Sequence, residues 1–206
     1  MAGTRAQGYT LEGVIASLVV LSAVLFAMQS VALTPSSGGS VDINERQNLR
    51  TQAADVLVLS SQNETFSLST LARHWDESKQ TFAGGLTPRL GYGSRQPRGQ
   101  IGEILNETFA NRSRTYNLEL RYLPRNASNG TLTTPVVFRG TPSDDAVVAS
   151  RTITLFDNQT LTSPGASDVE LWEYGTEIED DDGYYPVPNA VDGPVYNVVE
   201  VRLTVW

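Results

Sequence analysis

Apolar and polar positions change their spacing several times along the chain. Val14 to Leu33 is a run of twenty residues without a charge. At 1.5 Å per residue this run predicts a helix about 30 Å long, the thickness of a hydrocarbon core. We therefore expect a single-pass transmembrane helix over residues 9–33. A cleaved secretory signal would have a shorter apolar core and a small-residue cleavage site, and MQSVALTPSSGG is a poor match to such a site.

The polar stretch TPSSGGS, residues 34–40, predicts a flexible linker before an extracytoplasmic domain over residues 41–206. A helix is expected from Val41 to Ser61, because its apolar residues recur at intervals of three and four. These residues are Leu49, Ala53, Val56 and Leu57. Two shorter helices are expected over Ser67–Lys79 and Ile101–Phe109.

From Tyr116 onward the apolar residues alternate with polar ones, which is typical of half-buried strands. Four strands are predicted, over Tyr116–Tyr122, Pro135–Arg139, Val147–Phe156 and Val195–Trp206. Helices first and strands later favour the α+β class, with the long helix packed on an antiparallel β-sheet.

Charge is unevenly distributed along the chain, whose formal net charge is −8. From Ala166 to the end there are ten acidic residues and one basic residue, Arg202. A nucleic-acid partner is not expected, because phosphate binding needs a basic face. The fourteen arginines against one lysine, with an acidic surface, indicate a halophilic source.

The charges flanking the apolar run predict its orientation. Arg5 precedes the run, whereas Asp42 and Glu45 follow it, so the N-terminus is expected in the cytoplasm and the C-terminal domain outside the cell membrane. Glu12 lies in the first turn of the expected helix. It either complements the helix dipole there or pairs with a positive group of a neighbouring chain.

The segment RAQGYTLEGVIASLVVLSAVLFAMQ resembles the class III signal peptide of type IV pilins and pilin-like proteins, especially haloarchaeal ones. The resemblance implies that a leader peptidase removes residues 1–8 or fewer, cutting after Ala6 or after Gly8. It also implies that the helix can bundle into a filament core, with Glu12 neutralising the amino terminus of a neighbour. The residues implied in processing are Arg5, Ala6, Gln7, Gly8 and Tyr9.

Two departures from the pilin pattern bear on filament assembly. Glu12 becomes the fourth or the sixth residue of the mature chain, where bacterial pilins have it fifth. The linker also interrupts a helix that pilins often continue. The segments YNVVEVRLTVW and RTYNLELRYL are similar to an uncharacterised haloarchaeal family of pilin-like membrane proteins, to which no activity is attached.

Catalytic or metal chemistry has few candidates. The chain has no cysteine and one histidine, His74, expected on the exposed edge of a helix. Asp180 and Asp182 are a weak calcium candidate, since the first and last positions of a standard calcium loop are not filled by ligands, and a solvated acidic loop is favoured. GLTPRLGYGSRQPRG is interpreted as a surface loop. We expect no enzyme activity and no cofactor.

Six Asn-x-Ser/Thr sequons exceed the number expected from composition and favour an exposed glycoprotein domain. The candidates are Asn63, Asn106, Asn111, Asn126, Asn129 and Asn158. The leading hypothesis is a membrane-anchored cell-surface protein of the type IV pilin-like class, with lipid, like subunits and leader peptidase as partners. The alternative is a tethered extracellular binding domain that does not polymerise, and a membrane-tethered hydrolase is a weaker third.

Overall fold

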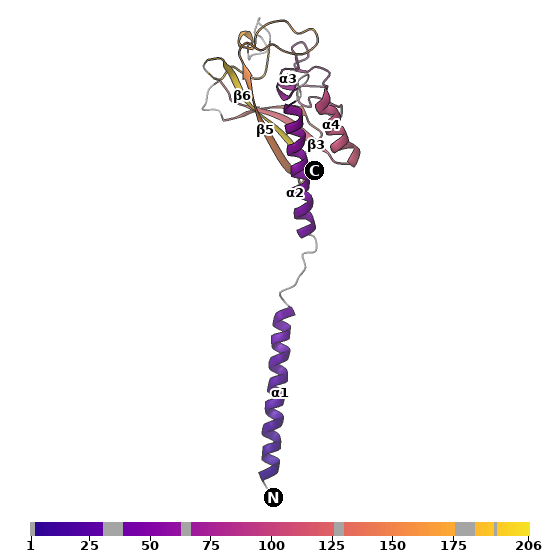
Figure 1. The fold of residues 1–206 in the computed structure, drawn as a ribbon, viewed down its shortest axis with the longest axis vertical. Coiled ribbons are helices and arrows are strands. Elements are labelled where there is room, and N and C mark those ends of the chain that lie inside the picture. Colours follow the sequence, from indigo (N-terminus) through magenta and orange to yellow (C-terminus); the bar gives the residue numbers. More distant parts are fainter. Residues whose placement is uncertain (1–2, 31–38, 63–66, 126–129, 176–183, 192) are drawn as a thin grey trace. The chain divides into compact units, whose positions relative to one another are not determined.

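The computed structural model describes residues 3–30, 39–62, 67–125, 130–175, 184–191 and 193–206 (Figure 1). The chain divides into two units, residues 1–43 and residues 44–206. The second unit therefore begins three residues after the predicted start of the outer domain.

The first unit contains helix α1, Gly3–Ser30. Among the described residues, no helix is both long enough and apolar enough to cross a membrane. The expected transmembrane helix over residues 9–33 is therefore wrong.

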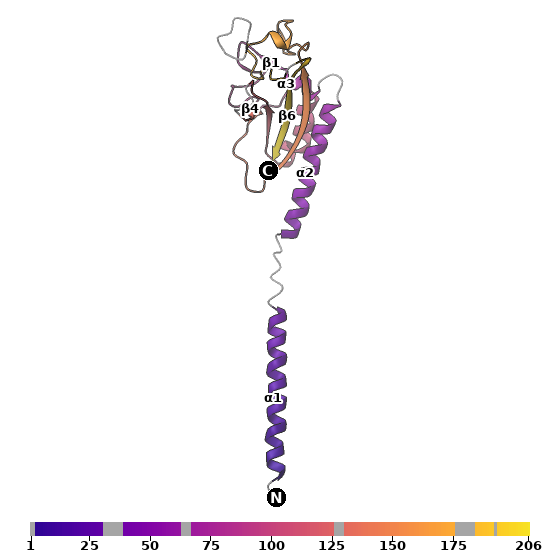
Figure 2. The ribbon, with the colours of Figure 1, turned by 90° about the vertical axis from the view of Figure 1, so that its left-hand side faces the viewer.

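The second unit is α+β, with helix α2 (Gly39–Ser61) packed on an antiparallel sheet. Figures 1 and 2 both show α2 running alongside the strands. The predicted apolar stripe of α2 is the buried one, and it joins the main core: Leu49, Ala53, Val56 and Leu57. Glu45 pairs with Arg114, and Arg46 lies 3.5 Å from Asp145, so polar contacts tie the exposed part of α2 to the rest of the unit.

The main sheet has four strands in the order β4-β3-β6-β5, all antiparallel neighbours. Their bounds are β3 Tyr116–Tyr122, β4 Leu132–Val137, β5 Val147–Phe156 and β6 Val195–Val205. The last strand, β6, lies between β3 and β5, so the C-terminal segment supplies a central strand and β4 and β5 are the two edges.

Alternation along β3 and β6 separates a buried face from a polar face. Leu120 pairs with Val201 on the buried face, and both are fully buried. On the other face Glu119 lies opposite Arg202 and Arg121 opposite Glu200, at N–O distances of 3.7 and 3.4 Å. Opposite charges directly across strands stabilise a solvated sheet face modestly.

The prediction of a helix over Ser67–Lys79 is wrong beyond its first turns. Helix α3 covers Leu68–Ala72 only, capped by Ser67, whose hydroxyl accepts a hydrogen bond from the Thr70 amide. The chain then forms a two-stranded hairpin, β1 (Trp75–Asp76) and β2 (Thr81–Phe82). Trp75 packs edge-on against Phe82 across this hairpin, at 5.4 Å between ring centroids, so tertiary packing overrides the helical spacing.

The remaining elements cover the buried face of the sheet. Helix α4 (Gln100–Thr108) buries Ile101 and Leu105 and leads into the 3₁₀ turn η1, Ala110–Arg112. A second 3₁₀ turn, η3, covers Leu171–Glu173. Six buried tyrosines of the described residues belong to the core: Tyr92, Tyr116, Tyr122, Tyr174, Tyr185 and Tyr196.

Candidate functional site

Helix α1 exposes large apolar side chains around its whole circumference. Eight of them have more than half of their surface accessible: Val14, Ile15, Leu18, Val19, Val20, Leu21, Val24 and Leu25. A helix that is apolar on all sides needs an apolar environment, because the free energy of the system decreases when such surface is removed from water. The chemistry of this surface is therefore association with other apolar groups.

The serines of α1 do not oppose such association. The Ser17 hydroxyl donates to the carbonyl of Val14 at 2.9 Å, and the Ser22 hydroxyl donates to that of Leu18 at 2.7 Å. Both hydroxyls are hydrogen-bonded within the helix, so burial of the helix would leave neither of these two donors unpaired. Gly13 has no neighbour within 4 Å of an added side chain, which leaves room for close approach of another helix.

Glu12 is exposed near the beginning of the described part of this apolar surface. The five residues predicted to direct processing lie in the backbone range of α1, and their side chains fall outside the described residues. Cleavage after Ala6 or Gly8 therefore stays a prediction, as does the pairing of Glu12 with a neighbouring chain.

Three of the six sequons lie in the described part of the domain. Asn111 and Asn158 are exposed, the first in η1 and the second in the turn after β5, whereas Asn106 is half-buried on α4. Asn63, Asn126 and Asn129 lie outside the described residues. Among the three, Asn111 and Asn158 are the sites that a glycosylating enzyme could reach in the folded domain.

His74 is buried, with 4% of its surface accessible, so its expected place on an exposed helix edge is wrong. It follows α3, and its Nδ1 lies 3.0 Å from the carbonyl oxygen of Thr162. Burial lowers the pKa of His74, the hydrogen bond to Thr162 opposes that shift, and the positive charge of Arg98 adds to it. The sole imidazole of the chain is therefore part of the packing between α3 and the segment after β5.

The acidic segment gives no metal centre that can be described. Asp180 and Asp182, the weak calcium candidates, lie outside the described residues. Within the described ranges, no group of three or more acidic or histidine side chains is placed to hold a metal ion.

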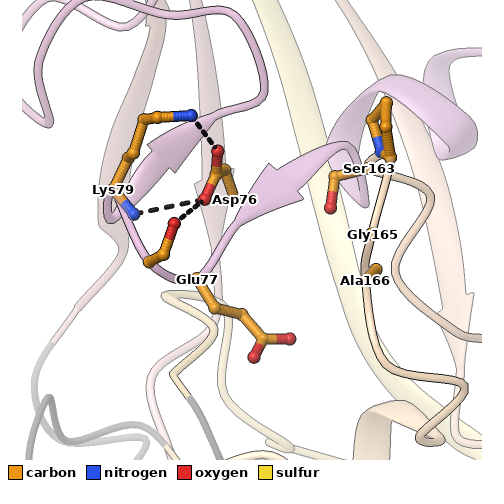
Figure 3. A pocket seen from close by; sticks show the side chains of 8 residues that line it. Asp76, Glu77, Lys79, Ser163, Gly165 and Ala166 are labelled. Atoms are coloured by element: carbon orange, nitrogen blue, oxygen red, sulfur yellow. Dashed lines mark hydrogen bonds and ion pairs between the residues drawn. The ribbon is translucent and has the colours of Figure 1, made fainter.

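A polar cavity of about 360 Å³ lies between the turn of the β1–β2 hairpin and residues 163–166 (Figure 3). It was not predicted from the sequence, although the turn sequence DESK contains the aspartate and serine that favour such turns. Figure 3 shows Asp76 bound within the turn, with Ser163 and Ala166 on the opposite wall.

Two charges of this cavity, those of Asp76 and Lys79, are paired with each other, whereas Oε1 of Glu77 is buried with no hydrogen-bond partner among the described residues. Asp76 accepts hydrogen bonds from the Lys79 ammonium at 2.7 Å and from the Ser78 hydroxyl at 2.6 Å. These two bonds are the main causes that lower the pKa of Asp76. The carboxylate is thus a weak base that stabilises a turn, and the cavity gives little support to hydrolytic chemistry.

Comparison with protein families places this chain. Residues 5–205 match the family described as "Family of unknown function (DUF7288)". The chain belongs to the DUF7288 family. The match includes most of α1 and all of the sheet, so both units are part of the family pattern. No curated protein and no solved structure matches the chain.

Proposed function

We propose that this DUF7288 protein is a non-enzymatic assembly subunit of the type IV pilin-like class at the cell surface. In this role α1 packs with the same helix of other copies, and the α+β domain faces outside the cell. The observation that carries the proposal is the apolar surface of α1, exposed on every side with its serine hydroxyls bonded internally.

The energetics favour apolar partners for α1. Burial of one large aliphatic side chain contributes about 1.5–3 kcal/mol, so a few contacts along α1 would outweigh the cost of ordering a side chain. Unassembled subunits would shield the same side chains against lipid. Like subunits and the bilayer are therefore the two partners proposed for α1, and a leader peptidase is a third for the segment before it.

The exposed positions of Asn111 and Asn158 support an outer location for the domain, because N-glycosylation requires accessible asparagines on the extracytoplasmic side. The outer face of the sheet, with its paired charges, is also suited to solvent. We propose no enzyme activity for this domain, since Asp76 is neutralised within its turn and His74 is buried.

The test is the N-terminal residue of the protein taken from native cells, measured by mass spectrometry together with the sedimentation of surface filaments. A start at Gln7 or Tyr9 in sedimenting material supports the proposal. A chain that begins at Met1 or Ala2 and never sediments would overturn it and favour the tethered binding domain.

Variants of α1 separate assembly from folding. Glu12→Ala and Val19→Arg should each remove the chain from the sedimenting fraction, the first through loss of the proposed pairing and the second through a charge in the helix interface. Val58→Arg, at an exposed position of α2, is the matched control and should sediment as before. Filaments that persist in both α1 variants would contradict the proposed interface.

A further inference from the structure

An apolar groove of about 420 Å³ lies on one edge of the sheet. It is formed by Thr87, Arg89, Leu90, Pro135 and Phe138, which come from β4, the residue after it and the loop beside it. Leu90 and Phe138 have 36% and 41% of their surfaces accessible, respectively. Arg89 is exposed at the groove, and no hydrogen bond or ion pair joins it to another described residue. The groove therefore offers apolar walls and one uncommitted positive charge.

Backbone hydrogen bonds hold the groove in shape. Gly91 donates to the carbonyl of Thr87 at 2.9 Å, and the Phe138 amide donates to the carbonyl of Leu90 at 3.0 Å. Tyr92 donates to Val136 at 2.7 Å, which fixes the loop to the outer side of β4. A groove fixed in this way loses little conformational freedom when a partner binds.

A rigid aromatic side chain projects near the opposite edge of the sheet. Trp172, in η3, has 55% of its surface accessible, although its neighbours Leu171 and Tyr174 are buried. The Leu171 amide donates to the carbonyl of Gln159 at 2.7 Å, so η3 is fixed to the segment directly after β5. An exposed tryptophan on a fixed backbone is the type of residue that carries binding energy at protein interfaces.

Two acidic side chains lie next to this tryptophan. The Trp172 indole nitrogen donates to the Glu170 carboxylate at 2.7 Å, and Glu173 is exposed beside it. Residues 166–175 contain three acidic residues and no basic one, whereas the residues that line the groove include Arg89 and no acidic residue. The tryptophan and the groove are thus complementary in shape, since one is an aromatic projection and the other an apolar hollow. They are also complementary in charge.

We propose that Trp172 of one copy inserts into the groove beside Arg89 of a second copy. The two surfaces lie near β5 and β4, the opposite edges of the sheet, which are about 14 Å apart at the usual strand spacing. Each copy therefore presents one half of the contact at each edge. Such a head-to-tail contact repeats from copy to copy and forms a ring or an open filament.

The inference rests on the proposed assembly role, because that role brings copies of the chain together. It adds a second interface, between the outer domains, that does not involve α1. Arg89 would pair with Glu170 or Glu173 of the neighbour, and removal of water around the tryptophan would supply the apolar part of the binding energy.

The absence of cysteine allows a clean cross-linking test on the full chain in detergent. One variant carries Glu173→Cys, which leaves Glu170 as the proposed partner of Arg89, and the other carries Thr87→Cys. The two variants are mixed under mild oxidation. We expect a disulfide-linked dimer in the mixture, with at least tenfold lower yield for either variant alone. Adding Arg89→Glu to the Thr87→Cys chain should lower the yield about tenfold, whereas Arg112→Glu, at another exposed arginine, should leave it unchanged.

Equal dimer yields with and without Arg89→Glu, or the absence of a mixed dimer, would overturn the proposed contact. A groove that binds lipid or an unrelated protein would give that result. The proposed assembly role is measured separately by the effect of Val19→Arg on sedimentation. If Val19→Arg abolishes sedimentation but the Arg89-dependent dimer still forms, the contact between Trp172 and the groove involves the outer domains only and does not depend on α1. Sedimentation that depends on α1 without the dimer would leave the assembly role standing and reject this contact.

Discussion

At the scale of single residues, His74 shows how burial turns the sole histidine into a stability determinant. Its imidazole is packed between α3 and the segment at Thr162, and burial lowers its pKa below the ordinary value of about 6.5. The folded state therefore binds a proton at lower pH than the unfolded chain does. In the pH range where the imidazole is protonated in the unfolded chain but not in the folded one, protonation favours unfolding.

The first residue-scale prediction follows from the lowered pKa of His74 in the folded state. Above about pH 7.5 His74 is neutral in both states and stability should not depend on it. As pH falls below about 6.5, the free energy of unfolding should decrease, by at most about 1.4 kcal/mol per pH unit. Urea unfolding between pH 7.5 and 5 measures the slope.

The control is His74→Gln, which removes the titrating group. Its overall stability can differ from that of the natural chain, but its slope between pH 7.5 and 5 should be flatter. An identical slope in both proteins would show that carboxyl groups, and not the imidazole, cause the pH dependence. Asp76 acts in another window: its lowered pKa contributes stability above pH 3.8 that is lost as pH falls through the folded pKa.

At the scale of elements, the loop beside β4 depends on a glycine. Gly91 has φ of +55°, and an added Cβ would lie 2.1 Å from the carbonyl oxygen of Val136. Gly91→Ala should therefore break the hydrogen bond between Tyr92 and Val136 and open the groove. The expected loss exceeds the roughly 1–2 kcal/mol that positive φ alone costs an L-residue.

Gly165→Ala is the matched control, because Gly165 has φ of +83° and nothing within 4 Å of its added Cβ. Comparison of the two urea midpoints separates the clash from the backbone strain. If both variants lose the same stability, the close approach of the loop to β4 is not tight enough to matter. Gly91→Ala should also reduce the Cys-linked dimer yield, whereas Gly165→Ala should not.

The elements were predictable where local spacing and tertiary packing agree. The strands β3 and β5 have the predicted bounds, and α4 begins one residue early. β4 begins at Leu132, three residues before the predicted Pro135. The prediction missed this start because the first residues of the strand are polar or exposed and show no alternation of apolar and polar positions. After α3 the helical spacing continued in the sequence, but the Trp75–Phe82 contact stabilises a hairpin instead.

The candidate interface was less predictable, because its parts meet only in the folded chain. The segment containing Arg89 was interpreted as a surface loop. Arg89 is exposed, but Tyr92 is buried in the core, and nothing local shows that Gly91 lies against Val136. Trp172 is one of three tryptophans in the sequence, and it is exposed although Leu171 and Tyr174 in the same segment are buried. Distances across the sheet determine both features, and sequence spacing does not record them.

At the scale of the whole molecule, association must overcome repulsion between copies that each carry a net charge of −8. This repulsion acts over distances near the Debye length, about 10 Å at 0.1 M salt and about 3 Å at 1 M. The proposed pair between Arg89 and Glu170 or Glu173 acts at contact and is partly shielded from water, so salt weakens it less. Screening of the repulsion should therefore be the larger effect.

The prediction is that the mixed Cys-linked dimer increases between 0.1 and 1 M NaCl. Apolar burial also strengthens in some salts, so a charge-neutralised variant is needed to separate the causes.

The control variant combines Glu103→Gln, Glu107→Gln and Asp168→Asn, which remove three exposed negative charges outside the proposed contact. If repulsion controls association, this variant should form more dimer at 0.1 M and show a weaker dependence on salt. If the salt dependence of the dimer yield is unchanged in this variant, the effect is assigned to apolar burial. If the dimer yield falls as salt increases, the ion pair at Arg89 outweighs the repulsion between whole copies.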